Sequence, residues 1–212
     1  MKGIHCRDSG GTRYNYDPSG GAGVDVYVST FGGRASWGAT FGGYANADGN
    51  GHGTHVAGTV GGTQYDVAKS VHLIVVKVLD DSGSGYISEA SGKPSIVSLS
   101  LGGSASTTFD NGIIAVINAG IHVVIAAGSD NTNALGTSPA RVAAAISVGA
   151  TTIADARAAF SNYGSVVDIF APGQYITSSW IGGTSMATPH VSDLVAYLIG
   201  LNSNQSPRQR GT

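Results

Sequence analysis

The segment SIVSLSLGGSASTTFDNGIIAVINAGIHVVIAA, residues 95–127, decides the fold class of this chain. Two short apolar runs rich in β-branched residues, at 95–101 and 121–127, flank a stretch of small and apolar residues at 109–119 that suits a helix. A strand, a helix and a second strand in this order are typical of a parallel sheet covered by helices. The segment therefore predicts an α/β fold.

The same alternation continues on both sides of this segment. Further strands are expected at 23–29, 71–79 and 145–150, and further helices at 52–61 and 185–200. Glycine-rich loops are expected at 32–53, 82–93, 128–138 and 171–184. The prediction is a mostly parallel sheet with helices on both faces, built as one domain over residues 23–201, with an N-terminal extension at 1–22 and a polar tail at 202–212.

Charge and composition exclude several classes of partner. The 212 residues hold 11 Lys and Arg against 13 Asp and Glu, so the formal net charge is -2 and the chain has no basic surface for nucleic acid or anionic membranes. No apolar run approaches the ~18 residues of a membrane-spanning helix. The single cysteine, Cys6, has no partner for an internal disulfide, and residues 1–13 lack the apolar run of a secretory signal.

Two segments carry residues that are able to do chemistry: DGNGHGTHVAGTVGG at 48–62 and IGGTSMATPHVSDLVAYL at 181–198. In each, a glycine-rich loop leads into a helix, so His52 and Ser185 are expected at helix N-termini on the rim of the sheet, where ligand crevices form in open α/β sheets. A helix N-terminus favours negative charge on an attacked carbonyl oxygen. Pro189 is expected in the first turn, where a helix loses no hydrogen bond to proline.

These motifs resemble those of the subtilases, the subtilisin-like serine proteases, and are similar to the fungal proteinase K group. The segments HGTHVAGT and GTSMATPH match the histidine and serine signatures, and KVLDDSGSG, SLSLGG, AAG and FSNYGSVVDIFAPG match further landmarks in the family's order. The resemblance implies a subtilisin-like three-layer fold and an extracellular serine endopeptidase with Ser185 as nucleophile and His52 as general base. It also implies a polypeptide substrate, and a propeptide or inhibitor as a partner in a longer precursor.

Further site residues follow from the resemblance alone. Ser100, Leu101 and Gly102 would form the extended edge that pairs with a bound peptide, while Ala126 and Gly128 would wall the pocket for a large apolar or aromatic residue before the cut. Ser129 occupies the position of the oxyanion-hole asparagine. No cofactor is expected for catalysis, but a structural Ca²⁺ would be held by the carbonyls of Ala143 and Ala145 and by Asp168.

The chain also departs from the family pattern. The Asp-Thr-Gly turn that supplies the triad aspartate is absent after the run VYV at 26–28, and neither Asp25 nor Asp48 is a convincing substitute. Together with a serine at position 129, this absence predicts impaired catalysis. The segment between Gly85 and Ser95 is too short for the family's helix, which predicts uncovered apolar surface on the strands at 71–79 and 95–101.

Several alternatives stay open at this point. The chain is either an impaired endopeptidase, a peptide-binding pseudoprotease without catalysis, or the product of an incomplete gene model. A zinc site at His52 and His55 and a generic glycine-rich α/β domain are the remaining readings. By family position His55 supports its helix, and His72, His122 and His190 are expected to be structural histidines with satisfied hydrogen bonds.

Overall fold

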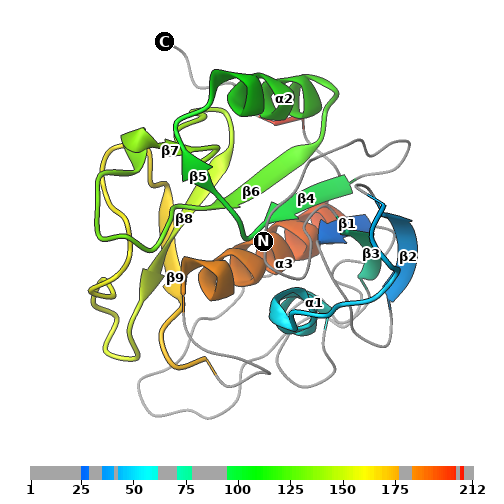
Figure 1. Cartoon of the computed structure of the whole chain (residues 1–212), viewed down its shortest axis with the longest axis horizontal. Coiled ribbons are helices and arrows are strands. Elements are labelled where there is room, and N and C mark those ends of the chain that lie inside the picture. The colour runs from blue at the N-terminus through cyan, green and yellow to red at the C-terminus, as the bar shows by residue number, and fades with distance from the viewer. Residues whose placement is uncertain are drawn as a thin grey trace.

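A sheet of parallel strands forms the middle layer of the molecule (Figure 1). The computed structural model describes residues 25–28, 35–40, 43–61, 71–77, 95–176, 183–203 and 206–207. The strands are β1 (Asp25–Val28), β2 (Ala35–Thr40), β3 (His72–Lys77), β4 (Ser95–Leu99), β5 (Gly103–Ser104), β6 (His122–Ala126), β7 (Thr137–Ser138), β8 (Ile146–Thr151) and β9 (Ile169–Pro172). The helices are α1 (His52–Gly61), α2 (Thr107–Asn118) and α3 (Thr184–Asn202), with a 3₁₀ helix, η1 (Ala134–Gly136).

The main sheet confirms the expected parallel topology. Seven strands pair in the order β2-β3-β1-β4-β6-β8-β9, and every ladder between them is parallel. The strand–helix–strand unit that predicted the fold is present, since β4 and β6 are neighbours with Val97 opposite Val123, and α2 connects them. The short strands β5 and β7 form a separate antiparallel pair.

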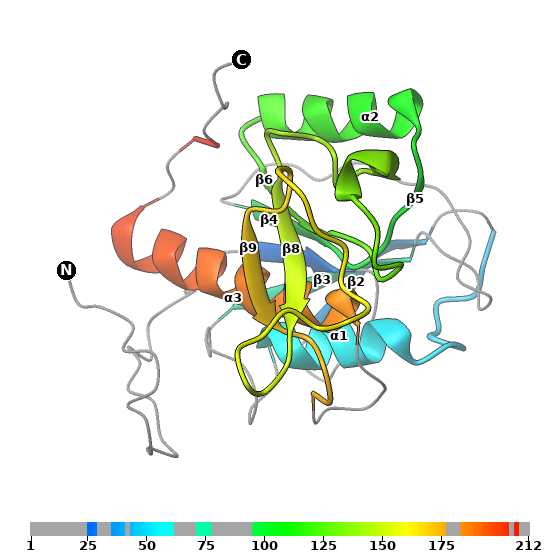
Figure 2. The same cartoon turned by 90° about the vertical axis from the view of Figure 1, so that its left-hand side faces the viewer.

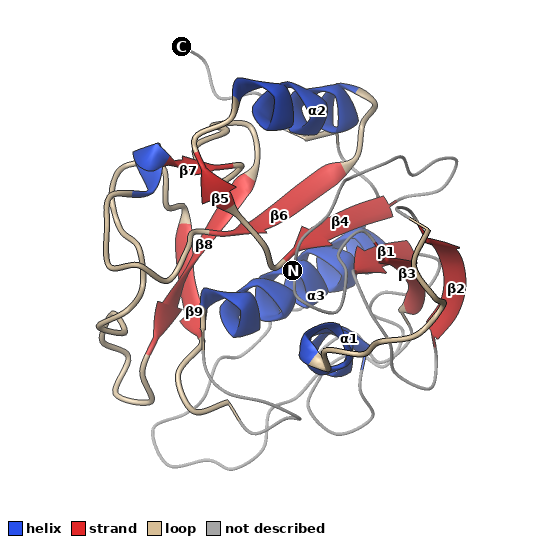
Figure 3. Cartoon of the chain, viewed as in Figure 1, coloured by secondary structure: helices blue, strands red, loops and turns tan. Residues whose placement is uncertain are grey.

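Helices cover both faces of this sheet, as expected. Figure 2 shows α2 on one side of the strands and α1 and α3 on the other, and Figure 3 shows the same layers by element type. The side chains of β6 divide between the two cores: Val124 packs in the cluster with α1 and α3, whereas Val123 and Ile125 pack in the cluster with α2. This period of two is what a strand buried on both faces requires. No helix in the described ranges is long and apolar enough to cross a membrane.

The strand β2 lies where the sequence predicted a loop. The segment 35–40 was expected within the loop 32–53, but it forms β2, an edge strand paired with β3. Its sequence ASWGAT lacks an apolar run, and Gly38 packs so closely that an added Cβ would lie 2.6 Å from Ile74 Cγ2. Tertiary pairing therefore overrides a weak local signal.

The other differences are at loops and element ends. The strand β9 was not predicted, and its last two residues lie in the predicted loop 171–184. Pro172 is tolerated there because β9 is an edge strand. The predicted loop 128–138 contains η1 and β7. Asn202, the first residue of the predicted tail, is instead the last residue of α3, and the predicted extension 1–22 lies outside the described residues.

The strands β3 and β4 are better covered than the sequence suggested. Leu73, Val75 and Ile96 are buried, whereas Ile74 and Val76 are half-buried. Uncovered apolar surface is therefore absent at Leu73, Val75 and Ile96, and on β3 it is reduced to the half-buried side chains of Ile74 and Val76.

Two histidines on the packed helices α1 and α3 have buried ring nitrogens without hydrogen-bond partners. His55 is fully buried with both nitrogens unpaired, and Nε2 of His190 is buried and unpaired, so the expectation of a satisfied His190 is wrong. Burial, and to a smaller extent the nearby His55, lowers the pKa of His190 to about 4. Burial lowers the pKa of His55 as well, with a smaller contribution from His52. Both rings are therefore held neutral in the folded protein.

A third buried polar group, the carboxamide of Asn162, holds the loop that follows β6. Its Nδ2 donates to the carbonyl of Ala127 (2.9 Å), while its Oδ1 accepts the backbone N–H groups of Asp130 and Thr132 (both 3.0 Å). Gly128 has φ of 103°, and a Cβ there would lie 2.3 Å from Asn162 Nδ2. The loop therefore wraps tightly around one side chain that is fully buried.

We expect the free energy of unfolding to fall by about 3 kcal/mol from His190 alone when the pH is lowered from 7 to 4. The ordinary pKa of 6.5 applies in the unfolded chain, which therefore binds more protons than the folded chain between that value and about 4. Urea unfolding of the wild type and His190→Gln at both pH values measures the effect. Equal pH dependence in the two proteins would contradict it.

We expect Asn162→Asp to destabilise the protein by about 2–4 kcal/mol. The substitution keeps the size of the side chain but replaces the donor to the Ala127 carbonyl by a carboxylate oxygen, so two acceptors face each other in a buried site. Asn111→Asp adds the same charge at an exposed position of α2 and serves as the control. The interpretation fails if both variants unfold at the same urea concentration as the wild type.

Candidate active site

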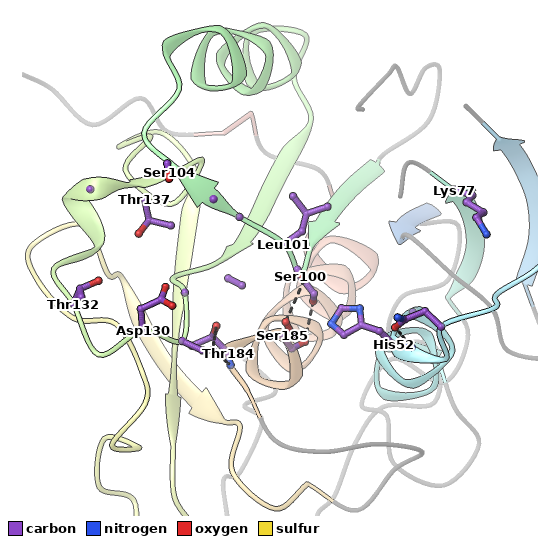
Figure 4. A pocket seen from close by; sticks show the side chains of 18 of the residues that line it. His52, Lys77, Ser100, Leu101, Ser104, Asp130, Thr132, Thr137, Thr184 and Ser185 are labelled. Atoms are coloured by element: carbon purple, nitrogen blue, oxygen red, sulfur yellow. Dashed lines mark hydrogen bonds between the residues drawn. The ribbon is translucent and has the colours of Figure 1, made fainter. Parts of the chain in front are cut away.

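A cavity of about 780 Å³ lies at the edge of the sheet where the parallel strands end (Figure 4). Ser100 directly follows β4, and Gly128 follows β6 by two residues. Both lie beside the cavity because the carboxyl ends of parallel strands meet at the same end of the sheet. His52 is the first residue of α1 and Ser185 the second of α3. The cavity lining includes His52, Ser100, Leu101, Gly102, Ala126, Gly128, Ser129 and Ser185. The fold thus brings together these sequence-predicted catalytic, oxyanion and substrate-binding residues.

Ser185 and Ser100 exchange two hydrogen bonds across the cavity floor. The Ser185 hydroxyl donates to the Ser100 carbonyl (3.2 Å), and the Ser100 hydroxyl donates to the Ser185 carbonyl (2.8 Å). Figure 4 shows the His52 ring directed toward this pair, although no hydrogen bond joins His52 and Ser185. Catalytic hydrogen bonds often form only when substrate is bound, so this geometry is compatible with a nucleophile and its base.

Asp48 organises the entry to α1. Its Oδ1 accepts from the backbone N–H groups of Asn50 (3.2 Å) and Gly51 (2.9 Å), and its Oδ2 accepts from the backbone and hydroxyl of Thr54 (3.0 and 2.6 Å). Burial alone would raise the pKa of Asp48, but these hydrogen bonds together lower it. The negative charge therefore stays next to the N-terminus of the helix that carries His52.

The electrostatic surroundings keep His52 neutral. Burial lowers its pKa, and the charge of Asp48 opposes this effect only in part. A neutral imidazole has a nitrogen lone pair that is able to accept a proton, as a general base requires.

The position of Asp25 separates it from this site. Asp25 is the first residue of β1 and lies opposite Ser95, the first residue of β4, whereas Ser100 comes just after the end of β4. Five residues of a strand span about 16 Å. Asp25 therefore starts its strand at the sheet edge opposite the cavity.

Ser129 contacts the start of helix α3. Its hydroxyl oxygen accepts the backbone N–H of Thr184 (3.2 Å) and lies 3.1 Å from the Thr184 hydroxyl. Gly183, the N-cap residue of α3, offers no side chain for this purpose. Ser129 therefore acts as a cap for α3 from a distant loop, which satisfies one of the unpaired N–H groups at the helix start.

Pro189 lies farther along α3 than expected. It is the sixth residue of a helix that begins at Thr184, so the predicted first-turn position is wrong. The hydrogen bond that a proline at this place cannot make is the one to the carbonyl four residues earlier, on Ser185.

The predicted calcium ligands lie near the start of β8, at the edge of the sheet away from the cavity. Ser147 donates its backbone N–H to Asp168 Oδ2 (2.8 Å), which places that carboxylate beside the segment that holds Ala143 and Ala145. Two carbonyls and a carboxylate form an all-oxygen set, which suits a hard cation. In the part of the chain that the structure describes, no three His, Cys, Asp or Glu side chains group as metal ligands, so the alternative of zinc at His52 and His55 gains no support.

Three residues at or next to the cavity were not predicted from the sequence. Thr184 presents a hydroxyl in the cavity lining and precedes Ser185 in the motif GTSMA, and this adjacency was the available signal. Asp130 is an exposed carboxylate on the wall of the same cavity. Asn162 acts on the cavity through the loop of Ala127 to Thr132, a contact between segments that no local pattern announces.

Comparison with known proteins shows which family this chain resembles. The model of the subtilase family matches residues 29–210. "Subtilisin-like protease 2" of Pseudogymnoascus destructans is 47% identical over 234 aligned positions, which cover 96% of this chain and 58% of that protein. The "Extracellular serine proteinase" of a Thermus species is 48% identical over 228 positions, covering 93% of this chain and 55% of that protein.

The length of the first alignment shows that the relative has residues without a counterpart in this chain. An aligned stretch of 234 positions exceeds the 212 residues of the chain, so the relative carries residues that have no counterpart here. The chain spans less than two thirds of the length of the curated relatives that it matches.

A solved structure agrees with the sequence relatives. The crystal structure of a cold-adapted subtilisin-like serine proteinase superposes with a TM-score of 0.84 at 43% identity, covering 92% of this chain and 81% of that one. The parallel sheet with helices on both faces, the cavity at its carboxyl edge and the family match over residues 29–210 lead to one conclusion: the chain belongs to the subtilase family.

Proposed function

We propose that this chain is a serine endopeptidase of low turnover, with Ser185 as nucleophile and His52 as general base. The observation that carries the proposal is the convergence of Ser185, His52 and the Ser100 edge on one cavity, at the start of two helices and the end of β4. The substrate would be a polypeptide in extended conformation, whose backbone adds to the edge at Ser100–Leu101–Gly102.

In this proposal the Ser185 oxygen attacks the carbonyl carbon of the scissile bond while its proton passes to the neutral His52. The C–N bond then breaks as the departing amine takes that proton, and a water molecule hydrolyses the acyl-serine by the same route. The Ser129 and Thr184 hydroxyls, together with the N-terminus of α3, are the groups available to stabilise negative charge on the attacked oxygen.

Low turnover follows from two features of the site. Asp48 acts on His52 only through its charge, because its oxygens already accept four hydrogen bonds at the start of α1. The Ser129 hydroxyl is shorter than the carboxamide of an asparagine, and it already contacts Thr184. Neither feature removes the nucleophile or its base.

A second candidate, a pseudoprotease that binds peptides without cleaving them, is favoured by one contact. The Ser185 hydroxyl donates to the Ser100 carbonyl instead of to His52, while the peptide-binding edge keeps its residues. An extracellular location, and a propeptide or inhibitor as partner, are proposals of the same kind that rest on the family. One relative is named an extracellular proteinase.

We expect kcat on a chromogenic peptide to lie at least about 10²-fold below the ~10 s⁻¹ that is typical of enzymes. A fluorophosphonate probe should still label the wild type, because Ser185 and His52 share the cavity. Ser185→Ala should abolish labelling and Ser165→Ala, at an exposed loop position, should not. Peptide binding without labelling would support the pseudoprotease, and kcat near 10 s⁻¹ would contradict impairment.

We further propose a structural Ca²⁺ held by the carbonyls of Ala143 and Ala145 and by Asp168. We expect millimolar Ca²⁺ to raise Tm and a chelator to reverse the increase, since an ion bound only by the folded state stabilises it. Asp168→Asn should remove the dependence of Tm on Ca²⁺, whereas Asp155→Asn, at a turn with φ of 56°, should retain it. An unchanged Tm in the wild type would rule out the site.

A further inference from the structure

We propose that Ser100 is a positioning residue for Ser185. The Ser100 hydroxyl donates to the Ser185 carbonyl, which has no donor within the helix because residue 189 is proline. Its catalytic consequence rests on the proposed function, in which Ser185 is the nucleophile. The structural part of the inference stands on hydrogen bonds alone and is testable without turnover.

Helix geometry determines which carbonyl loses its donor at Pro189. In an α-helix the N–H of each residue donates to the carbonyl four residues earlier, so the partner of residue 189 is the carbonyl of Ser185. Proline has no N–H, and in the interior of a helix it leaves that carbonyl without its donor. Pro189 is the sixth residue of α3, so the missing bond is inside the helix.

A side chain from another element fills this position. The Ser100 hydroxyl donates to the Ser185 carbonyl at 2.8 Å, from a residue that follows β4 and is 4% exposed. The dashed lines in Figure 4 mark this contact and its reciprocal. A carbonyl that is shielded from water and has no partner is costly, so this bond replaces the one that Pro189 cannot make. The contact also joins the main chain of Ser185 to the end of β4.

The reciprocal bond fixes the side chain. The Ser185 hydroxyl donates to the Ser100 carbonyl at 3.2 Å, so the same two residues hold both the backbone and the side-chain oxygen of the nucleophile. Removing the Ser100 hydroxyl would release the Ser185 backbone while leaving the Ser100 main chain, the expected peptide-binding edge, in place. The loss should therefore affect kcat and not KM.

The test is a double-mutant cycle with Ser100→Ala and Pro189→Ala. Ser100→Ala alone should lower Tm by about 5 °C, because it leaves the Ser185 carbonyl unpaired. Pro189→Ala restores an N–H that can donate to that carbonyl, so Ser100→Ala in this background should lower Tm by less than half as much. Ser165→Ala, an exposed serine, controls for the loss of a hydroxyl.

The second readout is the reactivity of the nucleophile. Ser100→Ala should reduce the rate of fluorophosphonate labelling and kcat about tenfold, with KM unchanged within twofold. Equal Tm losses in both backgrounds would overturn the structural part, whatever the activity. Labelling of Ser100→Ala at the wild-type rate would overturn the positioning role, whereas a wild type that does not label at all would contradict the proposed function and leave the Tm cycle to decide the contact.

Discussion

The loop that follows β6 at the candidate active site depends on the hydrogen bonds of the Asn162 carboxamide. It is the only side chain described here that bonds both the exit of β6, at the Ala127 carbonyl, and the N–H groups of Asp130 and Thr132. Ser129 lies within that loop and caps α3, the helix that carries Ser185. A chain of contacts thus runs from one buried amide, through one loop, to Thr184, the residue before Ser185. The hydrogen bonds of Asn162 are electrostatically stronger than those of exposed groups, because its side chain is fully buried away from water.

The central elements of the fold were predictable because their local and tertiary signals agree. The runs at 95–101 and 121–127 are apolar and β-branched, and they are also buried on both faces between α2 and α3. The edge strands β2 and β9 were both missed because their stability comes from pairing with β3 and β8, and the sequence of each contains glycine or proline. An edge strand pairs with a neighbour on one side only, so its amino-acid composition is less constrained than that of a central strand.

Prediction of the site divides in a similar way. The motifs around His52 and Ser185 identify positions at loop-to-helix junctions, and the parallel sheet then brings these junctions to one edge. The hydrogen bonds among these positions were not predictable. The exchange between Ser100 and Ser185 joins residues 85 apart in sequence, and the contact between Ser129 and Thr184 spans 55. Pro189 is a further example. The prediction put it in the first helical turn, where no carbonyl would lose a donor, but as the sixth residue of α3 it leaves the Ser185 carbonyl without one.

The four hydrogen bonds of Asp48 have a consequence for the proton on His52. A carboxylate has about four acceptor sites, and those of Asp48 are taken by the backbone of residues 50–54 and the Thr54 hydroxyl. Asp48 therefore does not select which imidazole nitrogen carries the hydrogen, and both tautomers remain accessible to the neutral ring. In the proposed mechanism, only the tautomer whose lone pair faces Ser185 is able to take its proton. The charge of Asp48 thus raises the pKa of His52 without fixing its tautomer.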